Sequence, residues 1–98
     1  MTRIRQCKSM DEVRKEIDRL DREIVPLLAE RAKYVAQAAG LKVHRTDVVV
    51  PARIEDVVRK ARKLAEQHDM DPELAEDIYR AMIDAFIKFE RHVWDSRV

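Results

Sequence analysis

The sequence predicts an all-α fold of three helices, one long and two shorter, that pairs into an intertwined homodimer. One glycine, three prolines and 5% aromatic residues favour helices over strands. Apolar residues that recur every three or four positions indicate the same. The chain has 98 residues, so we expect a single small domain that spans residues 1–98.

Composition excludes several classes of protein. The 20 Lys and Arg residues nearly balance 19 Asp and Glu residues, which argues against a general nucleic-acid binder. The 46% hydrophobic content is too high for a disordered chain. A single cysteine rules out an internal disulfide, and the three histidines lie too far apart in sequence to suggest a metal site. No run is long and uncharged enough to span a membrane, and residues 1–10 lack the apolar core of a signal peptide, so we expect a cytoplasmic protein.

The first helix is expected over about residues 10–42. Ser9 and Glu12 have the spacing of a capping box, in which Glu12 would accept a hydrogen bond from the Ser9 amide. Pro26 interrupts the pattern and either kinks the helix or ends it at Val25; we expect a kink, because the apolar phase continues across it. The apolar positions form a heptad-like seam of Met10, Val13, Ile17, Leu20, Ile24, Leu27, Leu28, Val35, Ala38 and Leu41.

The rest of the chain predicts a loop and two further helices. Residues 43–51 interrupt the helical pattern, and we expect an ordered loop there rather than a short strand, since no second strand-like run is available to pair with it. The second helix is expected over about residues 52–67. Asp71 and Pro72 have the form of an N-cap and a first helical residue, so the third helix is expected over about residues 72–94.

The length of the first helix favours a dimer. At about 1.5 Å per residue it measures roughly 50 Å, whereas a compact domain of this size is only roughly 30–35 Å across. The apolar seam would therefore extend beyond its own domain and need a second copy of the chain to cover it.

Several charged residues lie where apolar residues are expected. Arg31 falls on the seam, and Lys42 lies eleven residues later, on the same face within roughly 20° and about 16 Å along the axis, so both could reach one small anion. Alternatively, both side chains simply extend to water. Arg14 lies about 25 Å from Arg31 along the axis and could share a ligand with it only across a dimer.

Arg53 and Glu90 are two further candidates. Arg53 opens the second helix, where free amides and a cation favour anions, although it could belong to a solvated basic face. Glu90 lies among apolar residues of the third helix, so its carboxyl group should be protonated or face a cation, unless the helix frays there. The neighbouring basic residues of the second helix are Arg59, Lys60, Arg62 and Lys63.

These residues, in this order, resemble the all-helical chorismate mutase family. The resemblance covers residues from about Met10 to Trp94 and implies three helices in an intertwined dimer. It also implies rearrangement of chorismate to prephenate, without metal or cofactor, in aromatic amino-acid biosynthesis. The residues that carry it are Val13, Arg14, Ile17, Asp18, Leu20, Asp21 and Ile24, then Leu27 to Arg31, then Lys42 and Arg53.

The resemblance also implies roles for individual side chains. Arg14 of the partner copy and Arg31 would clamp the carboxylates of the substrate. Lys42 would bind a carboxylate and the ether oxygen, and Arg53 would add positive field. Glu90 would be the second catalytic group, and Phe86 and Ile54 would complete the substrate-binding residues.

Two positions depart from well-known bacterial mutases. Glu90 stands where those enzymes place a glutamine that donates to the ether oxygen, so Glu90 would have to be protonated. This predicts activity that falls as pH rises, and a Glu90→Gln variant should flatten that fall. Ile54 stands where those mutases have a glutamate, which resembles the isochorismate pyruvate-lyases that produce salicylate and pyruvate on the same scaffold.

Three alternatives to the mutase therefore stay open. The first is the isochorismate pyruvate-lyase. The second is a non-catalytic helical dimerisation module, which would explain the seam but not Arg31 or Glu90. The third, a nucleic-acid binder built on the basic residues of the second helix, is the least favoured, because the charge balance of the chain opposes it.

Overall fold

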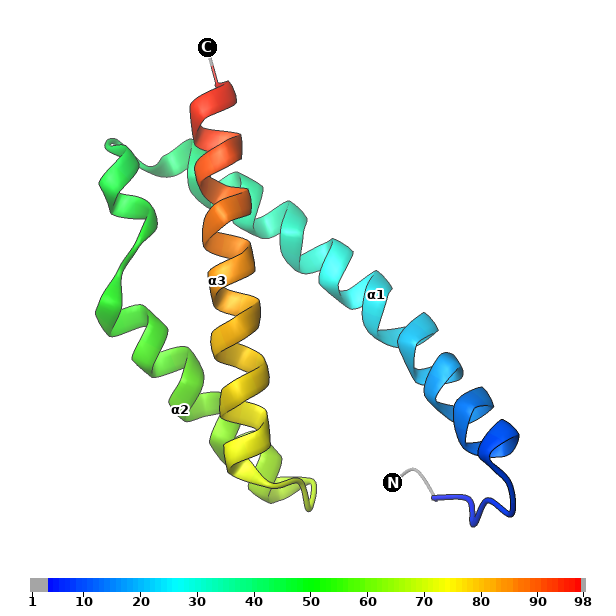
Figure 1. Ribbon diagram of the computed structural model, residues 1–98. Helices are drawn as coiled ribbons and strands as arrows, with labels where there is room; N and C mark the ends of the chain where they lie inside the picture. Colours follow the sequence, from blue (N-terminus) through cyan, green and yellow to red (C-terminus); the bar gives the residue numbers. More distant parts are fainter. Residues whose placement is uncertain (1–3, 98) are drawn as a thin grey trace. The chain divides into compact units, whose positions relative to one another are not determined.

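The computed structural model describes residues 4–97, and these residues contain helices and no strand. The chain divides between Lys33 and Tyr34 into two compact units, each of which is described by itself. The elements are α1 (Met10–Leu41), a short 3₁₀ helix η1 (Arg45–Val48), α2 (Pro51–Gln67) and α3 (Pro72–Ser96). The prediction of an all-α chain with one long and two shorter helices is confirmed (Figure 1).

Helix α1 starts as its cap predicts and continues through Pro26. The hydroxyl oxygen of Ser9 accepts a hydrogen bond from the amide of Glu12 at 3.2 Å. The other half of the predicted capping box is wrong, because the Glu12 carboxylate accepts from the Lys8 amide at 2.7 Å and not from Ser9. The proline does not end the helix, which runs to Leu41, one residue short of the expected end.

The loop after α1 contains one turn of 3₁₀ helix and no strand. The carboxylate of Asp47 accepts a hydrogen bond from the His44 amide at 3.0 Å, which fixes the first turn of η1. Val48 is buried, whereas the other residues of η1 are exposed. The loop is therefore tied down by one apolar side chain, as an ordered loop requires.

Helices α2 and α3 each begin at a proline, whose fixed φ and missing N–H suit a first helical position. Pro51 starts α2 one residue earlier than expected. The Asp71 side chain accepts from the Glu73 amide at 3.0 Å and caps α3 as predicted. Helix α3 continues to Ser96, two residues beyond the expected end.

Helices α2 and α3 lie side by side and share a core of small residues (Figure 1). Alanines at the contact let the two backbones approach closely, and Ile83 is the large apolar side chain that α3 buries there. By contrast, Leu74, Ile78 and Phe89, which are apolar residues of the same helix, are exposed. The core residues of the pair are Val58, Ala61, Ala65, Ala75 and Ile83.

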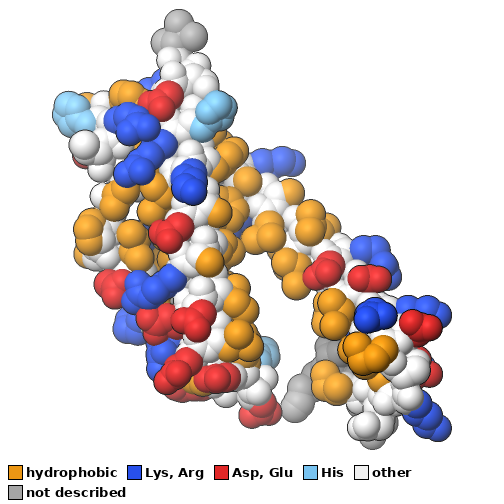
Figure 2. Space-filling model, viewed as in Figure 1, with side chains coloured by type: hydrophobic (Ala, Val, Ile, Leu, Met, Phe, Trp, Pro, Cys, Tyr) orange, Lys and Arg blue, Asp and Glu red, His pale blue; other side chains and the backbone are white. Residues whose placement is uncertain are grey.

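A network of ion pairs joins α2 to α3 on their outer surface. Arg80 donates to both carboxylate oxygens of Glu55 at 2.9 and 3.0 Å and to Glu76 at 2.7 Å. Arg62 adds a second cation to Glu76 at 2.8 Å. These hydrogen bonds lower the pKa of both glutamates. Figure 2 shows the basic and acidic side chains interspersed along this face.

The seam of α1 leaves large apolar side chains at the surface. Ile17, Leu20, Ile24 and Leu27 are between 43% and 65% exposed. Burial of such side chains is the main source of stability for a helix of this kind, so a single copy of the chain leaves that stabilisation unused. Within residues 4–97, no helix is both long enough and apolar enough to cross a membrane.

Candidate functional site

The predicted site residues divide between the two units. Arg14 and Arg31 lie on α1 in the first unit, and the others lie in the second unit. Arg14 is exposed and Arg31 is partly buried. Because α1 is unbroken between them, their backbones are about 25 Å apart at 1.5 Å per residue. The two arginines of one α1 therefore cannot hold the same small ligand.

Lys42 and Glu90, 48 residues apart in the sequence, form an ion pair within the second unit. The Lys42 ammonium donates to Oε2 of Glu90 over 2.6 Å. The two side chains are only 23% and 10% exposed, respectively. Water therefore screens this pair much less than a surface pair.

Glu90 is buried and belongs to an unfrayed part of α3, which continues six residues further to Ser96. A carboxyl group on an apolar stripe is expected to be protonated or to face a cation. The Glu90 carboxylate faces a cation, Lys42. Phe86 lies one turn earlier on the same face of α3, since residues four apart are neighbours on a helix. Its ring meets that of Phe89 edge to face, with centroids 6.3 Å apart, and adds apolar surface on that side of α3.

Lys42 owes its place to the end of α1. The helix stops at Leu41, and the Lys42 amide still donates to the Ala39 carbonyl at 3.3 Å, so the last turn is tightened rather than released. Ala39 is completely buried. A small buried residue at this point lets the helix end pack closely, and Lys42 follows directly from that rigid turn.

Arg53 and Ile54 lie in the first turn of α2. Arg53 is exposed and donates to Asp56 at 3.2 Å. The Asp56 carboxylate also forms ion pairs with Arg59 at 2.7 Å and Lys60 at 2.9 Å. The hydrogen bonds from Lys60 and Arg59 lower the pKa of Asp56 to about 2. One carboxylate thus pairs with three cations, so this cluster at the start of α2 keeps a net positive charge. The ion pair of Arg53 with Asp56 thus lies within α2.

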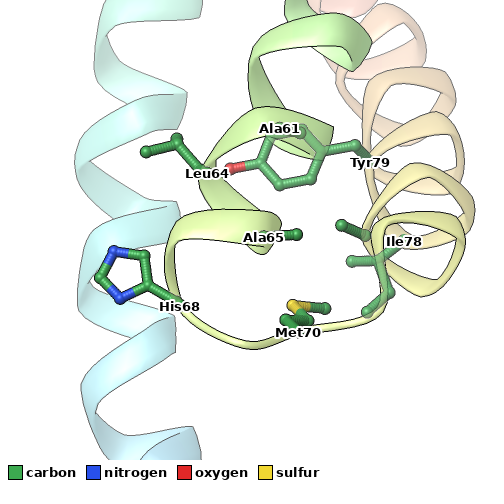
Figure 3. A pocket seen from close by; sticks show the side chains of 8 residues that line it. Ala61, Leu64, Ala65, His68, Met70, Ile78 and Tyr79 are labelled. Atoms are coloured by element: carbon green, nitrogen blue, oxygen red, sulfur yellow. The ribbon is translucent and has the colours of Figure 1, made fainter.

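An apolar hollow of about 260 Å³ opens where α2 turns into α3. Figure 3 shows Leu64, Met70, Ile78 and Tyr79 around it, with His68 at its edge. None of the predicted site residues lines it. A dicarboxylate needs cations, and the residues that line the hollow include no Lys or Arg, only the His68 ring and the Tyr79 hydroxyl as polar groups, so the hollow does not suit a doubly charged anion.

Sequence reasoning missed three residues whose contacts surround Lys42. Arg45 pairs with Asp95 in a two-pronged contact at 2.9 and 3.3 Å, and Arg97 donates to backbone carbonyls at the end of α1. No periodicity signals such contacts, because they join segments that are 50 or more residues apart. Among residues 4–97, no group of three His, Cys, Asp or Glu side chains is placed to hold a metal ion.

Comparison with known proteins identifies the family of the chain. A profile of the family described as chorismate mutase type II matches residues 13–91. The isochorismate pyruvate lyase of Pseudomonas aeruginosa is 26% identical over 90% of this chain and 87% of its own length. The chorismate mutase of Methanocaldococcus jannaschii is 28% identical over 79% of each chain.

A third relative is longer. The bifunctional chorismate mutase/prephenate dehydratase of Aquifex aeolicus is 32% identical over 88% of this chain, which spans 25% of that protein. The match to the family covers most of the chain and includes both Lys42 and Glu90. The resemblance inferred from the ordered series of basic residues is confirmed: the chain belongs to the chorismate mutase type II family and is an enzyme of that family.

Proposed function

We propose that the chain converts chorismate to prephenate within one domain, in a site completed by a second copy of itself. The observation that carries the proposal is the family match over residues 13–91. Within that range, Lys42 and Glu90 form the least exposed ion pair, which we take as the centre of the candidate site. The rearrangement proceeds in one pericyclic step, so it requires neither a nucleophile nor a covalent intermediate. The single cysteine fits a reducing, cytoplasmic compartment.

The proposed catalysis consists of holding the substrate and stabilising charge. Arg31 and the partner's Arg14 bind the two carboxylates, which keeps the substrate in the folded shape that the reaction needs. Lys42 binds a carboxylate and the ether oxygen, where negative charge grows as the C–O bond breaks. Arg53, Ile54 and Phe86 form the rest of the substrate's surroundings, with Arg53 adding positive field.

Glu90 sets a condition on this chemistry. Its carboxylate accepts from the Lys42 ammonium, the same group that the substrate needs. An ionised carboxylate there also repels the charge that develops on the ether oxygen. We therefore propose that substrate binding is coupled to proton uptake by Glu90, whose carboxylic acid then donates a hydrogen bond to the ether oxygen.

A homodimer is supported by the apolar surface that one copy leaves uncovered. Ile17, Leu20, Ile24 and Leu27 follow the seam of α1, and all four are exposed. The separation of Arg14 from Arg31 along α1 also favours a dimer. A small ligand bound by an Arg14 and an Arg31 side chain must take them from two different chains. An intertwined dimer accounts for both features with one arrangement.

A second candidate reaction is the elimination of pyruvate from isochorismate. The relative named isochorismate pyruvate lyase is 26% identical over 90% of this chain. Ile54 also stands where the resemblance places a glutamate in the mutases. The two reactions place similar demands on the cations, because both substrates are dicarboxylates and both lose a C–O bond. The distinction therefore depends on the surroundings of the ring hydroxyl.

Product analysis distinguishes these functions. Purified protein is incubated separately with chorismate and isochorismate, and the products are identified by chromatography. Prephenate from chorismate supports the mutase, and salicylate with pyruvate from isochorismate supports the lyase. If neither substrate turns over and millimolar prephenate does not raise the melting temperature, the chain is instead a non-catalytic dimerisation module.

A further inference from the structure

The end of α3 holds the backbone of Lys42. Arg97 directly follows α3, and its Nη1 donates to the Lys42 carbonyl at 2.9 Å and to the Ala39 carbonyl at 3.3 Å. The guanidinium also lies over the Trp94 ring, 4.3 Å from its centroid. Stacking of this kind restricts the rotamers of the arginine, so its donors stay directed at the two carbonyls.

The Arg97 side chain satisfies carbonyl groups at the C-terminal end of α1. The last carbonyls of a helix have no partner within the helix, and glycine or a nearby cation usually satisfies them. Helix α1 has no basic residue in its last turn, and its one glycine, Gly40, lies inside the helix rather than after it. Arg97 thus supplies, from another element, the C-terminal cation that α1 lacks.

The segment after Lys42 is held by the same turn of α3. Arg45 of η1 donates to both carboxylate oxygens of Asp95. The hydrogen bond from Arg45 lowers the pKa of Asp95, with smaller contributions from His92 and Arg91. The backbone of Lys42 is therefore fixed on its upstream side by Arg97 and on its downstream side by Arg45.

The residues that make these contacts, Asp95 and Arg97, lie at the end of the helix that carries Glu90 and directly after it. Glu90 lies in the last two turns of α3, and Arg97 is the residue directly after Ser96, where the helix ends. The C-terminal end of α3, together with the residue that follows it, thus offers a carboxylate to the ammonium of Lys42 and a guanidinium to its carbonyl. The side chain and the backbone of Lys42 are therefore both held by residues at the C-terminal end of α3.

We propose that Arg97 is a positioning residue for Lys42, with the Asp95–Arg45 pair as its downstream counterpart. This inference rests on the proposed role of Lys42 in turnover. Without Arg97 the end of α1 and η1 gain freedom, and the ammonium samples orientations that do not reach the ether oxygen. Misplacement of a catalytic group by about 1 Å can lower a rate up to a hundredfold.

Kinetics of Arg97 variants test the proposal. We expect Arg97→Gln to lower kcat/KM about tenfold, mostly through kcat, because the shorter, neutral amide loses the charge and the reach of the guanidinium. Arg97→Lys should recover most of the loss, since it keeps a cation long enough to donate to a carbonyl. In a Lys42→Gln background, Arg97→Gln should change kcat/KM by less than about twofold, because the group that it positions is gone. Lys63→Gln, which removes one exposed cation from α2, serves as the control for loss of charge.

Hydrogen exchange supplies a readout that needs no turnover. In Arg97→Gln and Asp95→Asn, amides of residues 42–48 should exchange faster than in the wild type, while those of residues 55–65 in α2 keep their protection. Equal tenfold losses in both Lys42 backgrounds, or unchanged exchange at residues 42–48, would overturn the proposal. A wild-type protein that turns over neither substrate would refute the proposed function, and the exchange result would still decide whether Arg97 holds this segment.

Discussion

Replacing Glu90 with glutamine tests the coupling between proton uptake and turnover. The amide keeps the size of the carboxylic acid, donates an N–H at every pH, and its oxygen still accepts from Lys42. In the wild type, the fraction of enzyme with a protonated Glu90 falls as pH rises, so kcat/KM should fall as well. In Glu90→Gln that fall should be absent.

The size of the effect follows from the geometry of Lys42. The ammonium holds Oε2 of Glu90 at 2.6 Å. A second acceptor on the same ammonium, such as the ether oxygen, lies about 4.4 Å from that carboxylate oxygen for two tetrahedral N–H directions of hydrogen-bond length. With half a unit of charge on the ether oxygen and an effective dielectric constant of about 20, the repulsion is about 2 kcal/mol, or roughly 30-fold in rate.

The assay is chorismate consumption at about pH 5 to about pH 9, with kcat/KM measured at each pH. The variant should depend less on pH than the wild type and exceed it by up to roughly 30-fold at the alkaline end. Glu66→Gln, an exposed position on α2, controls for the loss of a carboxylate. If wild type and Glu90→Gln have parallel pH profiles, Glu90 does not act on the reacting oxygen and the reasoning fails.

Three further predictions concern the dimer, the ring hydroxyl and acid stability. Leu20→Asp should raise the dimer dissociation constant by roughly a hundredfold or more, because each dimer would bury two unpaired carboxylates. Sedimentation measures this constant, and an unchanged value would place Leu20 outside the interface. Ile54→Glu should shift the ratio of kcat/KM for chorismate over isochorismate about tenfold toward chorismate, and a constant ratio would refute its role in specificity. Asp56 stabilises the folded chain above its unfolded pKa of 3.8, and this contribution is lost as pH falls toward about 2. In acid titrations followed by circular dichroism, Asp56→Asn should therefore lose less stability over that range than the wild type, and identical curves would contradict the assignment.

The helical framework could be predicted because local patterns determine it. The α3 cap at Asp71 and Pro72 depends on residues adjacent in sequence, and the uninterrupted apolar phase around Pro26 correctly predicts that α1 continues. The partner of the Glu12 carboxylate was predicted one residue off, because neighbouring amides compete for the same acceptor and small backbone differences decide between them.

The centre of the candidate site was only partly predictable. Burial of Glu90 follows from the apolar stripe around it, and a buried carboxylate requires either a proton or a cation. The contacts of Arg45 and Arg97, by contrast, depend on where the end of α1 meets the end of α3. Such a meeting is a property of the packed chain, and neither residue lies on an apolar stripe that would single it out.

Complementation between two defective chains tests the central claim that cations from two copies form one site. Arg14→Ala and Lys42→Ala should each be nearly inactive as homodimers. When the two are co-refolded in equal amounts, half of the dimers are mixed, and each mixed dimer holds one intact site, so activity should return to about a quarter of the wild-type value. Activity that stays at the level of the two variants alone would show that Arg14 and Lys42 act within the same chain, or do not act on the substrate at all.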